Sequence, residues 1–222
     1  MKEISIDIAK SAVLKHANDN DFSIVFDDDP RRIAVIYAVS SVHKHLNTGF
    51  DFETAKQGLS ITLPGAGVAE LLLQQIPVVG QLLQFLSKGL SKPTIFYSPA
   101  ATSTGKSLIS THIHETGHVG SIRKGGILWC GCYGLFDVVR SAGEAPCYGA
   151  NIAIDHAFAG KPLEQAESEA NDSLSHYGLS ESELTFAKAM VHSNVVTLKR
   201  GGDPGGVIAD AKRILIDVGW QE

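Results

Sequence analysis

Residues 111–120 read THIHETGHVG and hold three histidines and one glutamate. Within them His114, Glu115 and His118 satisfy the metal-binding pattern HExxH. Residues four apart lie on one face of an α-helix, so both imidazoles can reach one metal ion. Glu115 lies about 100° around the helix, where it can act as general base on a water that the metal has acidified. The spacing predicts a catalytic Zn²⁺ site.

His112 precedes His114 by two residues and points to nearly the opposite side of such a helix. We therefore expect His112 to be a core or surface histidine rather than a ligand. His156 neighbours Asp155 and is a weaker candidate, as a donor to the transition state. The alternative for the whole stretch is a helix with incidental histidines.

A short strand is expected at residues 94–97, in KPTIFYSPA, and a helix over 108–118 follows it. A short strand followed by a helix that bears HETGH resembles the core of the zincin metallopeptidases. Position 124 is Lys124, so the third histidine of the pattern HExxHxxGxxH is missing. The resemblance therefore implies a carboxylate as the third protein ligand. It covers residues 94 to about 159, less than a third of the chain.

Glu144, Tyr148, Asn151 and Asp155 are spaced four, three and four residues apart, so they form one polar stripe on a helix. This arrangement resembles the gluzincins, in which a glutamate on a second helix completes a His, His, Glu ligand set. The resemblance implies that Glu144 is the third ligand and that Tyr148 polarises the scissile carbonyl or stabilises the oxyanion. Asn151 or Asp155 would orient one of the histidines.

Two residues compete with that assignment. Asp137 is a rival third ligand because it is closer in sequence to His118. Pro146 lies just after Glu144, so we expect the second helix to begin there, with Glu144 in its first turn. The polar stripe itself has a plainer alternative, a solvated helix face.

The composition is that of a folded globular protein, with 222 residues of which 44% are hydrophobic. A net charge of −5 argues against a nucleic-acid partner, which needs a cationic surface. Residues 100–107, AATSTGKS, fit a phosphate loop loosely, but the first glycine and a βαβ pattern are missing, so a loop with a helix cap is simpler. We expect Cys130, Cys132 and Cys147 to be reduced thiols that pack as small apolar groups, with metal ligation as the weaker alternative.

The N-terminus carries charges at Glu3, Asp7 and Lys10, so we expect no signal peptide and synthesis in the cytoplasm, with incorporation into a larger assembly left open. Residues 63–90 are the most apolar segment, but glutamines and Pro77 interrupt them. We expect two short helices that meet at Pro77. They form either a buried hairpin or a surface for a membrane or a protein assembly.

The predicted fold class is mainly α, that is α+β with a minimal β-sheet, with a zincin-like core and helical N- and C-terminal elaborations. Residues 1–92 form a helical N-terminal region and residues 93–222 the metal-binding region, together one compact domain. A glycine-rich connection is expected around WCGCYG. The further helices are expected at residues 3–17, 30–46, 134–159, 162–176, 180–198 and 204–218.

The leading hypothesis is a zinc-dependent hydrolase, a metallopeptidase that cleaves an amide bond in a peptide or cell-wall peptide substrate. Its ligands would be His114, His118 and Glu144, and Glu115 its general base. The alternative is a structural or interaction component of a secretion system or virus particle, or a membrane-associating protein, that retains a zincin-like core. That alternative would work through residues 63–90.

Overall fold

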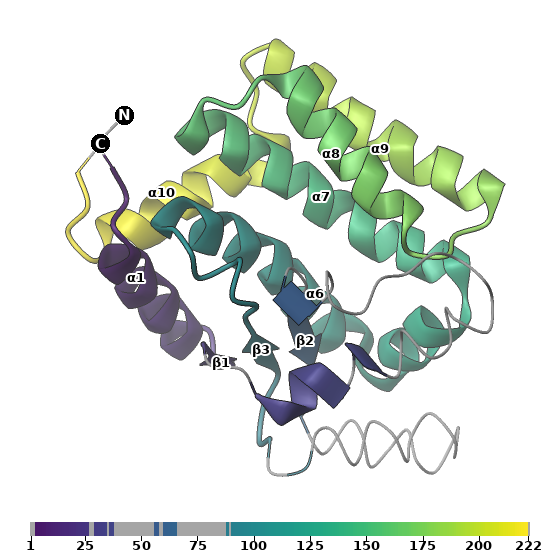
Figure 1. The fold of residues 1–222 in the computed structure, drawn as a ribbon, viewed down its shortest axis with the longest axis horizontal. Coiled ribbons are helices and arrows are strands. Elements are labelled where there is room, and N and C mark those ends of the chain that lie inside the picture. Colours follow the sequence, from purple (N-terminus) through teal and green to yellow (C-terminus); the bar gives the residue numbers. More distant parts are fainter. Residues whose placement is uncertain are drawn as a thin grey trace.

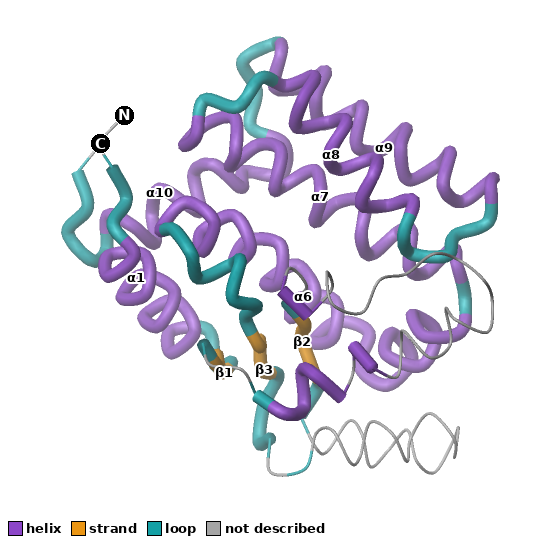
Figure 2. Tube along the Cα trace, viewed as in Figure 1, coloured by secondary structure: helices purple, strands orange, loops and turns teal. Residues whose placement is uncertain are grey.

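The computed structural model describes residues 3–26, 29–34, 36–37, 56–57, 60–65, 88 and 90–221. Over these residues the protein is mainly helical and has one small sheet, as the sequence predicts (Figure 2). Of the helix expected at 30–46, residues 30–34 and 36–37 are described and are helical. The rest of that segment, and all of the apolar segment 63–90 except residues 63–65, 88 and 90, lies outside the described residues. Among those that are described, no helix combines the length and the apolar character needed to cross a membrane.

Helix α1 (Ile6–Asp19) begins where the Ser5 hydroxyl accepts a hydrogen bond from the Ile8 amide. Its buried face consists of small residues, Ala9, Ala12, Val13 and Ala17. Such a face lets other elements approach closely. Helix α1 therefore packs against α6 (Gly105–Leu135) and α10 (Val207–Ile216), and the three share one core.

The described residues form a three-stranded sheet in the order β1-β3-β2. The central strand β3 (Thr94–Phe96) was expected and is buried throughout. It pairs in parallel with β1 (Ser23–Val25) and antiparallel with β2 (Ile61–Leu63). The sequence did not predict the two outer strands, because three residues are too few to show a period of two.

Helix α6 begins at Gly105, where the Thr104 hydroxyl accepts a hydrogen bond from the Ser107 amide. A Cβ on Gly105 would lie 2.1 Å from the carbonyl oxygen of Ile4, so the backbone of the N-terminal segment covers this helix start. Residues 100–107 thus form a capped loop closed by neighbouring chain, in agreement with the simpler of the two sequence interpretations.

The prediction of a glycine-rich connection around WCGCYG was wrong. Helix α6 continues through these residues to Leu135 and changes direction at Gly126, whose φ of 51° only glycine adopts easily. A single glycine therefore bends the helix without ending it. The second limb, after Gly126, turns back towards α7.

Helix α7 (Asp137–Ala159) corrects the expectation that a helix begins near Pro146. It begins nine residues earlier, and Pro146 lies in its interior. Pro146 and Ala142 are both exposed, so the backbone carbonyl that the proline cannot bond lies on the solvent side. Glu144 consequently sits in mid-helix. Gly160, in the left-handed conformation, ends the helix.

The remaining helices agree with the sequence prediction to within three residues. They are α8 (Leu163–Ser175), α9 (Glu181–Lys199) and α10, which a 3-10 turn at Pro204–Gly206 precedes. Helices α7, α8 and α9 pack together around a second core, and α6 with α1 and the sheet lies on the other side of α7 (Figure 1). Helix α7 is thus the shared wall between two halves of the protein.

Candidate metal centre

The structure brings together the two histidines of HETGH and Glu144. The first limb of α6 presents His114 and His118 on one face, and α7 presents Glu144 opposite them. Glu144 Oε2 lies 3.5 Å from His114 Nε2, and Oε1 lies 3.3 Å from His118 Nε2. A tetrahedral zinc ion with bonds of about 2.0–2.1 Å holds its ligand atoms about 3.3–3.4 Å apart. Each histidine thus faces a different oxygen of Glu144, at a separation close to that between two ligands of one zinc ion.

The charges at this centre depend on one another. Glu144 is 1% exposed, and its Oε2 accepts no hydrogen bond. Burial works against its charge, but His118 and His114 hold the pKa of Glu144 down at about 2. Burial likewise opposes a charge on His114, yet Glu144 raises the pKa of His114 to about 9. Without a metal, a proton on His114 supplies the positive charge that this carboxylate needs.

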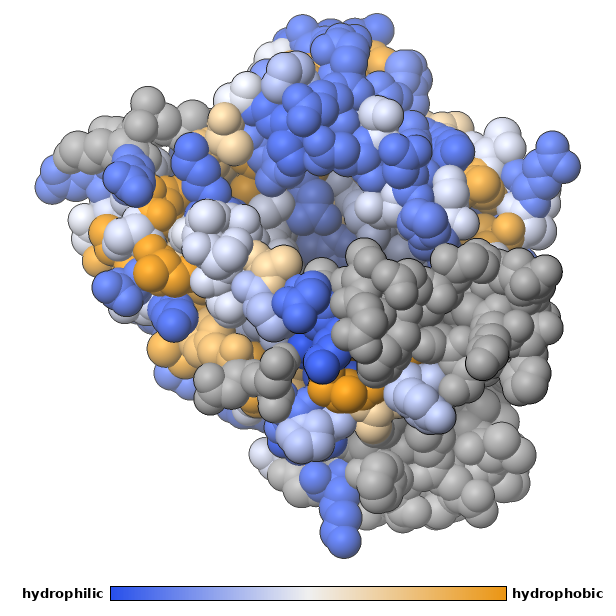
Figure 3. Space-filling model, in the orientation of Figure 1, coloured by the Kyte–Doolittle hydropathy of each residue, from blue (hydrophilic) through white to orange (hydrophobic). Residues whose placement is uncertain are grey.

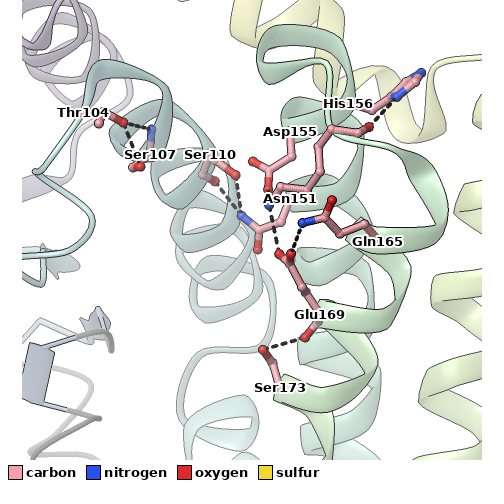
Figure 4. Close-up of polar contacts among 10 residues, drawn as sticks. Thr104, Ser107, Ser110, Asn151, Asp155, His156, Gln165, Glu169 and Ser173 are labelled. Atoms are coloured by element: carbon pink, nitrogen blue, oxygen red, sulfur yellow. Dashed lines mark hydrogen bonds and ion pairs between the residues drawn. The ribbon is translucent and has the colours of Figure 1, made fainter.

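Asn151 fixes the orientation of His114. Its Oδ1 lies 2.6 Å from His114 Nδ1, while its amide nitrogen donates to the carbonyl and hydroxyl oxygens of Ser110 at 3.0 and 2.9 Å. Figure 4 shows Asn151 between Ser110 of α6 and Glu169 of α8. Since Oδ1 can only accept, His114 carries a proton on Nδ1, which leaves Nε2 on the Glu144 side for a second proton or a metal ion. Asp155 instead pairs with Lys161, at 2.6 Å.

Glu115 is 4% exposed and is held by the sheet. Its Oε2 accepts a hydrogen bond from the Thr62 hydroxyl of strand β2, at 2.6 Å. The carboxylate therefore has a fixed position beside the two histidines, on the side where β2 lies. Thr62 could not be found from the sequence, because it belongs to a strand that was not predicted.

Two tyrosines flank the centre and differ in what their hydroxyl groups bond. The ring of Tyr148 lies edge-on to His114, with centroids 5.1 Å apart, but its hydroxyl donates to Tyr177 at 3.4 Å. The hydroxyl of Tyr133 instead donates to Glu144 Oε1. Burial and Glu144 raise the pKa of Tyr133 well above its ordinary value, so it stays a donor. The sequence pointed to Tyr148 and missed Tyr133.

Tyr133 reaches the centre because of two glycines. The bend at Gly126 turns the second limb of α6 towards α7. On α7, a Cβ at Gly143 would lie 2.8 Å from the ring of Trp129 and 3.3 Å from that of Tyr133, so both rings occupy the space of a missing side chain. No spacing rule applies across a bend, and the sequence therefore held no signal for this contact.

Cys147 also faces the histidines. Its Sγ and one ring nitrogen each of His114 and His118 all lie within 4.8 Å of one another. Burial raises the pKa of Cys147 well above its ordinary value, and Glu144 and Glu115 raise it further. The sequence analysis treated all three cysteines as packing groups. A signal was present, because Cys147 follows Glu144 by three residues and so shares its helix face.

The other candidates lie elsewhere. His112 is fully buried on the opposite face of α6, as a core residue. Its ring nitrogens lie 2.6 Å from the Tyr97 hydroxyl and 2.8 Å from His16 Nδ1. His156 is exposed and lies against the Lys161 carbonyl. Asp137 pairs with Arg140 and accepts from the Ser180 amide, at the start of α7.

A cavity of about 140 Å³ adjoins His114 between α7 and α8. Its lining mixes polar and apolar side chains: Tyr148, Asn151, Ile152, Asp155, Ala166, Glu169, Ala170 and Ser173. Figure 3 shows a hydrophilic hollow near the middle of this face, over α7. Tyr148 and Asn151 border the cavity and also contact His114, Asn151 at the Nδ1 atom.

The chain was compared with known proteins in three ways. No family model, no curated protein and no solved structure matches it. The chemistry of the site is therefore argued from its own residues.

Proposed function

We propose that the protein is a zinc-dependent hydrolase, a metallopeptidase that cleaves an amide bond. His114, His118 and Glu144 would hold Zn²⁺, and Glu115 would act as general base. The observation that carries the proposal is that the buried Glu144 offers one oxygen to each histidine, 3.5 Å from His114 Nε2 and 3.3 Å from His118 Nε2. A buried carboxylate oxygen without a hydrogen-bond donor supports it, because such an atom needs a cation.

Zinc, when bound, would supply Lewis acidity that acidifies water and polarises a carbonyl group. The protein's own residues would do the rest. Asn151 keeps the proton of His114 on Nδ1, and Tyr133 stabilises the charge of Glu144 by donating to Oε1. Glu115, held by Thr62, would take a proton from the attacking water and pass it to the leaving nitrogen. Tyr148 stays a proposed donor to the carbonyl, although its hydroxyl here bonds Tyr177.

A peptide is the substrate class that fits the surroundings. Among the described residues β2 pairs on one side only, with β3, so an extended peptide could add to its other edge. Thr62 of β2 touches Glu115, which would place such a peptide beside the general base. The cavity next to His114, lined by both polar and apolar side chains, would hold a side chain of such a peptide. We include in the proposal a zincin-like core of the gluzincin type, built from β3, α6 and α7.

Two measurements test the proposal. Purified protein should contain one zinc per chain, and His114→Ala and His118→Ala should contain none. Glu115→Gln should keep the zinc and lose hydrolysis of a peptide library by about 10²- to 10⁴-fold, the usual contribution of a general base. Glu181→Gln, at an exposed position in the first turn of α9, is the matched control and should retain hydrolysis. A wild-type protein free of zinc would refute the proposal.

A second candidate function is a structural component of a larger assembly or a membrane-bound protein. It is favoured by three exposed apolar side chains where α6 ends and α7 begins: Leu128, Phe136 and Val138, at 74%, 53% and 53% exposure. Residues 66–87, which suggested this function, lie outside the described residues. Liposome flotation and size-exclusion chromatography test it. A protein that is monomeric and does not float with liposomes would exclude this second function.

A further inference from the structure

Cys147 is a second potential metal ligand that α7 presents to the histidines. It follows Glu144 by three residues, which places both side chains on the α6 side of the helix. Cys147 is 5% exposed, and its Sγ lies within 4.8 Å of a ring nitrogen of each histidine. The thiol is therefore buried together with the two histidines of the proposed site.

Helix α6 has a gap at the place that the sulfur occupies. A Cβ on Gly117 would lie 2.7 Å from Cys147 Sγ, far inside van der Waals contact. Gly117 stands between His114 and His118, in the turn that carries both ligands. Because Gly117 has no side chain, the thiol of Cys147 can lie against this turn of α6. The sulfur therefore lies with the two histidines and not within the neighbouring apolar core.

The distances suit a fourth bond. In a tetrahedral zinc site with Zn–S of about 2.3 Å, sulfur lies about 3.6 Å from each nitrogen ligand. The 4.8 Å limit on the present separations leaves at most about 1.2 Å to close, within the reach of a side-chain adjustment. The buried Glu144 Oε2 without a hydrogen-bond partner is an independent sign that a cation belongs between these groups.

We infer that Cys147 is a fourth protein ligand of the resting metal centre and that it holds the position which a hydrolytic water needs. The inference rests on the metal site of the proposed function. Catalytic zinc sites keep one position open, whereas four protein ligands make a closed site. The hydrolase would then be latent as folded, and displacement of the Cys147 sulfur would open it.

Cobalt substitution tests the ligand directly, without an assay of hydrolysis. Co²⁺-loaded wild-type protein should show a near-ultraviolet charge-transfer band from thiolate to cobalt, besides the visible bands of a tetrahedral ion. The band should disappear in Cys147→Ser and Cys147→Ala. It should persist in Cys130→Ser and Cys132→Ser, the matched controls. Gly117→Ala keeps all three cysteines in the sequence. It should still weaken the band, because the added Cβ would displace Cys147 Sγ from the histidines.

Access to the metal tests the closure. Acetohydroxamate, a small oxygen ligand for zinc and cobalt, should perturb the visible bands of Cys147→Ala at a concentration at least about tenfold lower than in wild type. Equal sensitivity of the two proteins would overturn the closed site. Visible bands without a charge-transfer band, or a band that survives in Cys147→Ala, would overturn the ligand while the zinc proposal stands. Failure to bind metal at all would overturn both.

Discussion

The two faces of α6 bury histidines in opposite environments. His112, on one face, has hydrogen-bond partners without negative charge, Tyr97 and His16, and burial, followed by repulsion from a positive charge on His16, lowers its pKa well below the ordinary value. His114, on the other face, has Glu144, and its pKa rises to about 9 although it is buried as well. Although only two positions separate them on one helix, His112 has a lowered pKa and His114 has a raised one.

The comparison shows that burial alone does not make a metal site. Burial disfavours charge on any imidazole, so a lone core histidine becomes a packing residue. A buried carboxylate next to the imidazole favours a positive charge there instead, because the carboxylate must be neutralised by a proton or by a metal ion. The carboxylate thus decides what a histidine does here.

The largest effect is expected from Glu144→Gln, which would make His114 resemble His112. Zinc binding should be lost, and the metal-free protein should lose about 3–5 kcal/mol of stability at pH 6, the usual cost of breaking a buried ion pair. Metal analysis and urea unfolding with a chelator present measure both quantities. Asp137→Asn, the rival ligand, should keep its zinc. A Glu144→Gln protein with full zinc content would remove Glu144 from the ligand set.

The pH dependence of stability separates the two faces without a mutation. The folded-state pKa of His114 is raised, so its contribution is complete below pH 6.5 and is lost as pH rises through about 9. The loss is on the order of 3 kcal/mol. The folded-state pKa of His112 is lowered, so its contribution is lost as pH falls below 6.5.

The metal-free protein should therefore be most stable near pH 6.5. Urea unfolding at pH 5, 6.5 and 9 with a chelator present measures this. In His112→Gln the decline towards acid should become shallower, while the decline towards base should not change. A stability that keeps rising to pH 9 would show that no proton is held between His114 and Glu144.

An intermediate effect is expected from Asn151→Ala. Loss of the group that fixes the proton on His114 Nδ1 should weaken zinc affinity by about 10- to 100-fold, or about 1.4–2.7 kcal/mol. Competition with a chromophoric chelator measures the affinity. Asp155→Ala, one turn further along the same stripe, removes a pair with Lys161 and should leave the affinity unchanged.

The smallest effect is expected from Tyr97→Phe, on the His112 face. It removes the hydroxyl from His112 Nδ1 in a fully buried place and should cost about 1–2 kcal/mol of stability. Its zinc content should equal that of wild type. Thermal unfolding and metal analysis provide the readouts. A loss of zinc in this variant would mean that the two faces of α6 are coupled.

The sequence predicts the local parts of this architecture and misses what depends on distant contacts. Helical periodicity and terminal glycines are local, so α8, α9 and α10 lie close to their expected positions. The glycines of WCGCYG and Pro146 misled the prediction, because a helix can continue through glycine, and through proline where the unbonded carbonyl has room. Whether there is room depends on packing that a sequence pattern does not contain.

The same division holds for the site. His114 and His118 are candidates because one helical turn separates them, and Glu144 is a candidate because the polar stripe it begins resembles the gluzincin arrangement. Thr62 and Tyr133 reach the site through a short strand and through the second limb of a bent helix, and spacing carries no information about either. The Tyr148 ring lies beside His114, close to the site as the prediction requires. Its hydroxyl, however, donates a hydrogen bond to Tyr177.

The gap at Gly117 has an evolutionary consequence. Because a Cβ at residue 117 and a sulfur at residue 147 would compete for the same space, the two positions cannot vary independently. Among homologues, a larger residue at the fourth position of HETGH should accompany the loss of the cysteine. Those lineages would carry a metal centre with one ligand fewer. Covariation between positions 117 and 147 would then distinguish homologues whose metal site is closed by the cysteine from homologues whose metal site is always open.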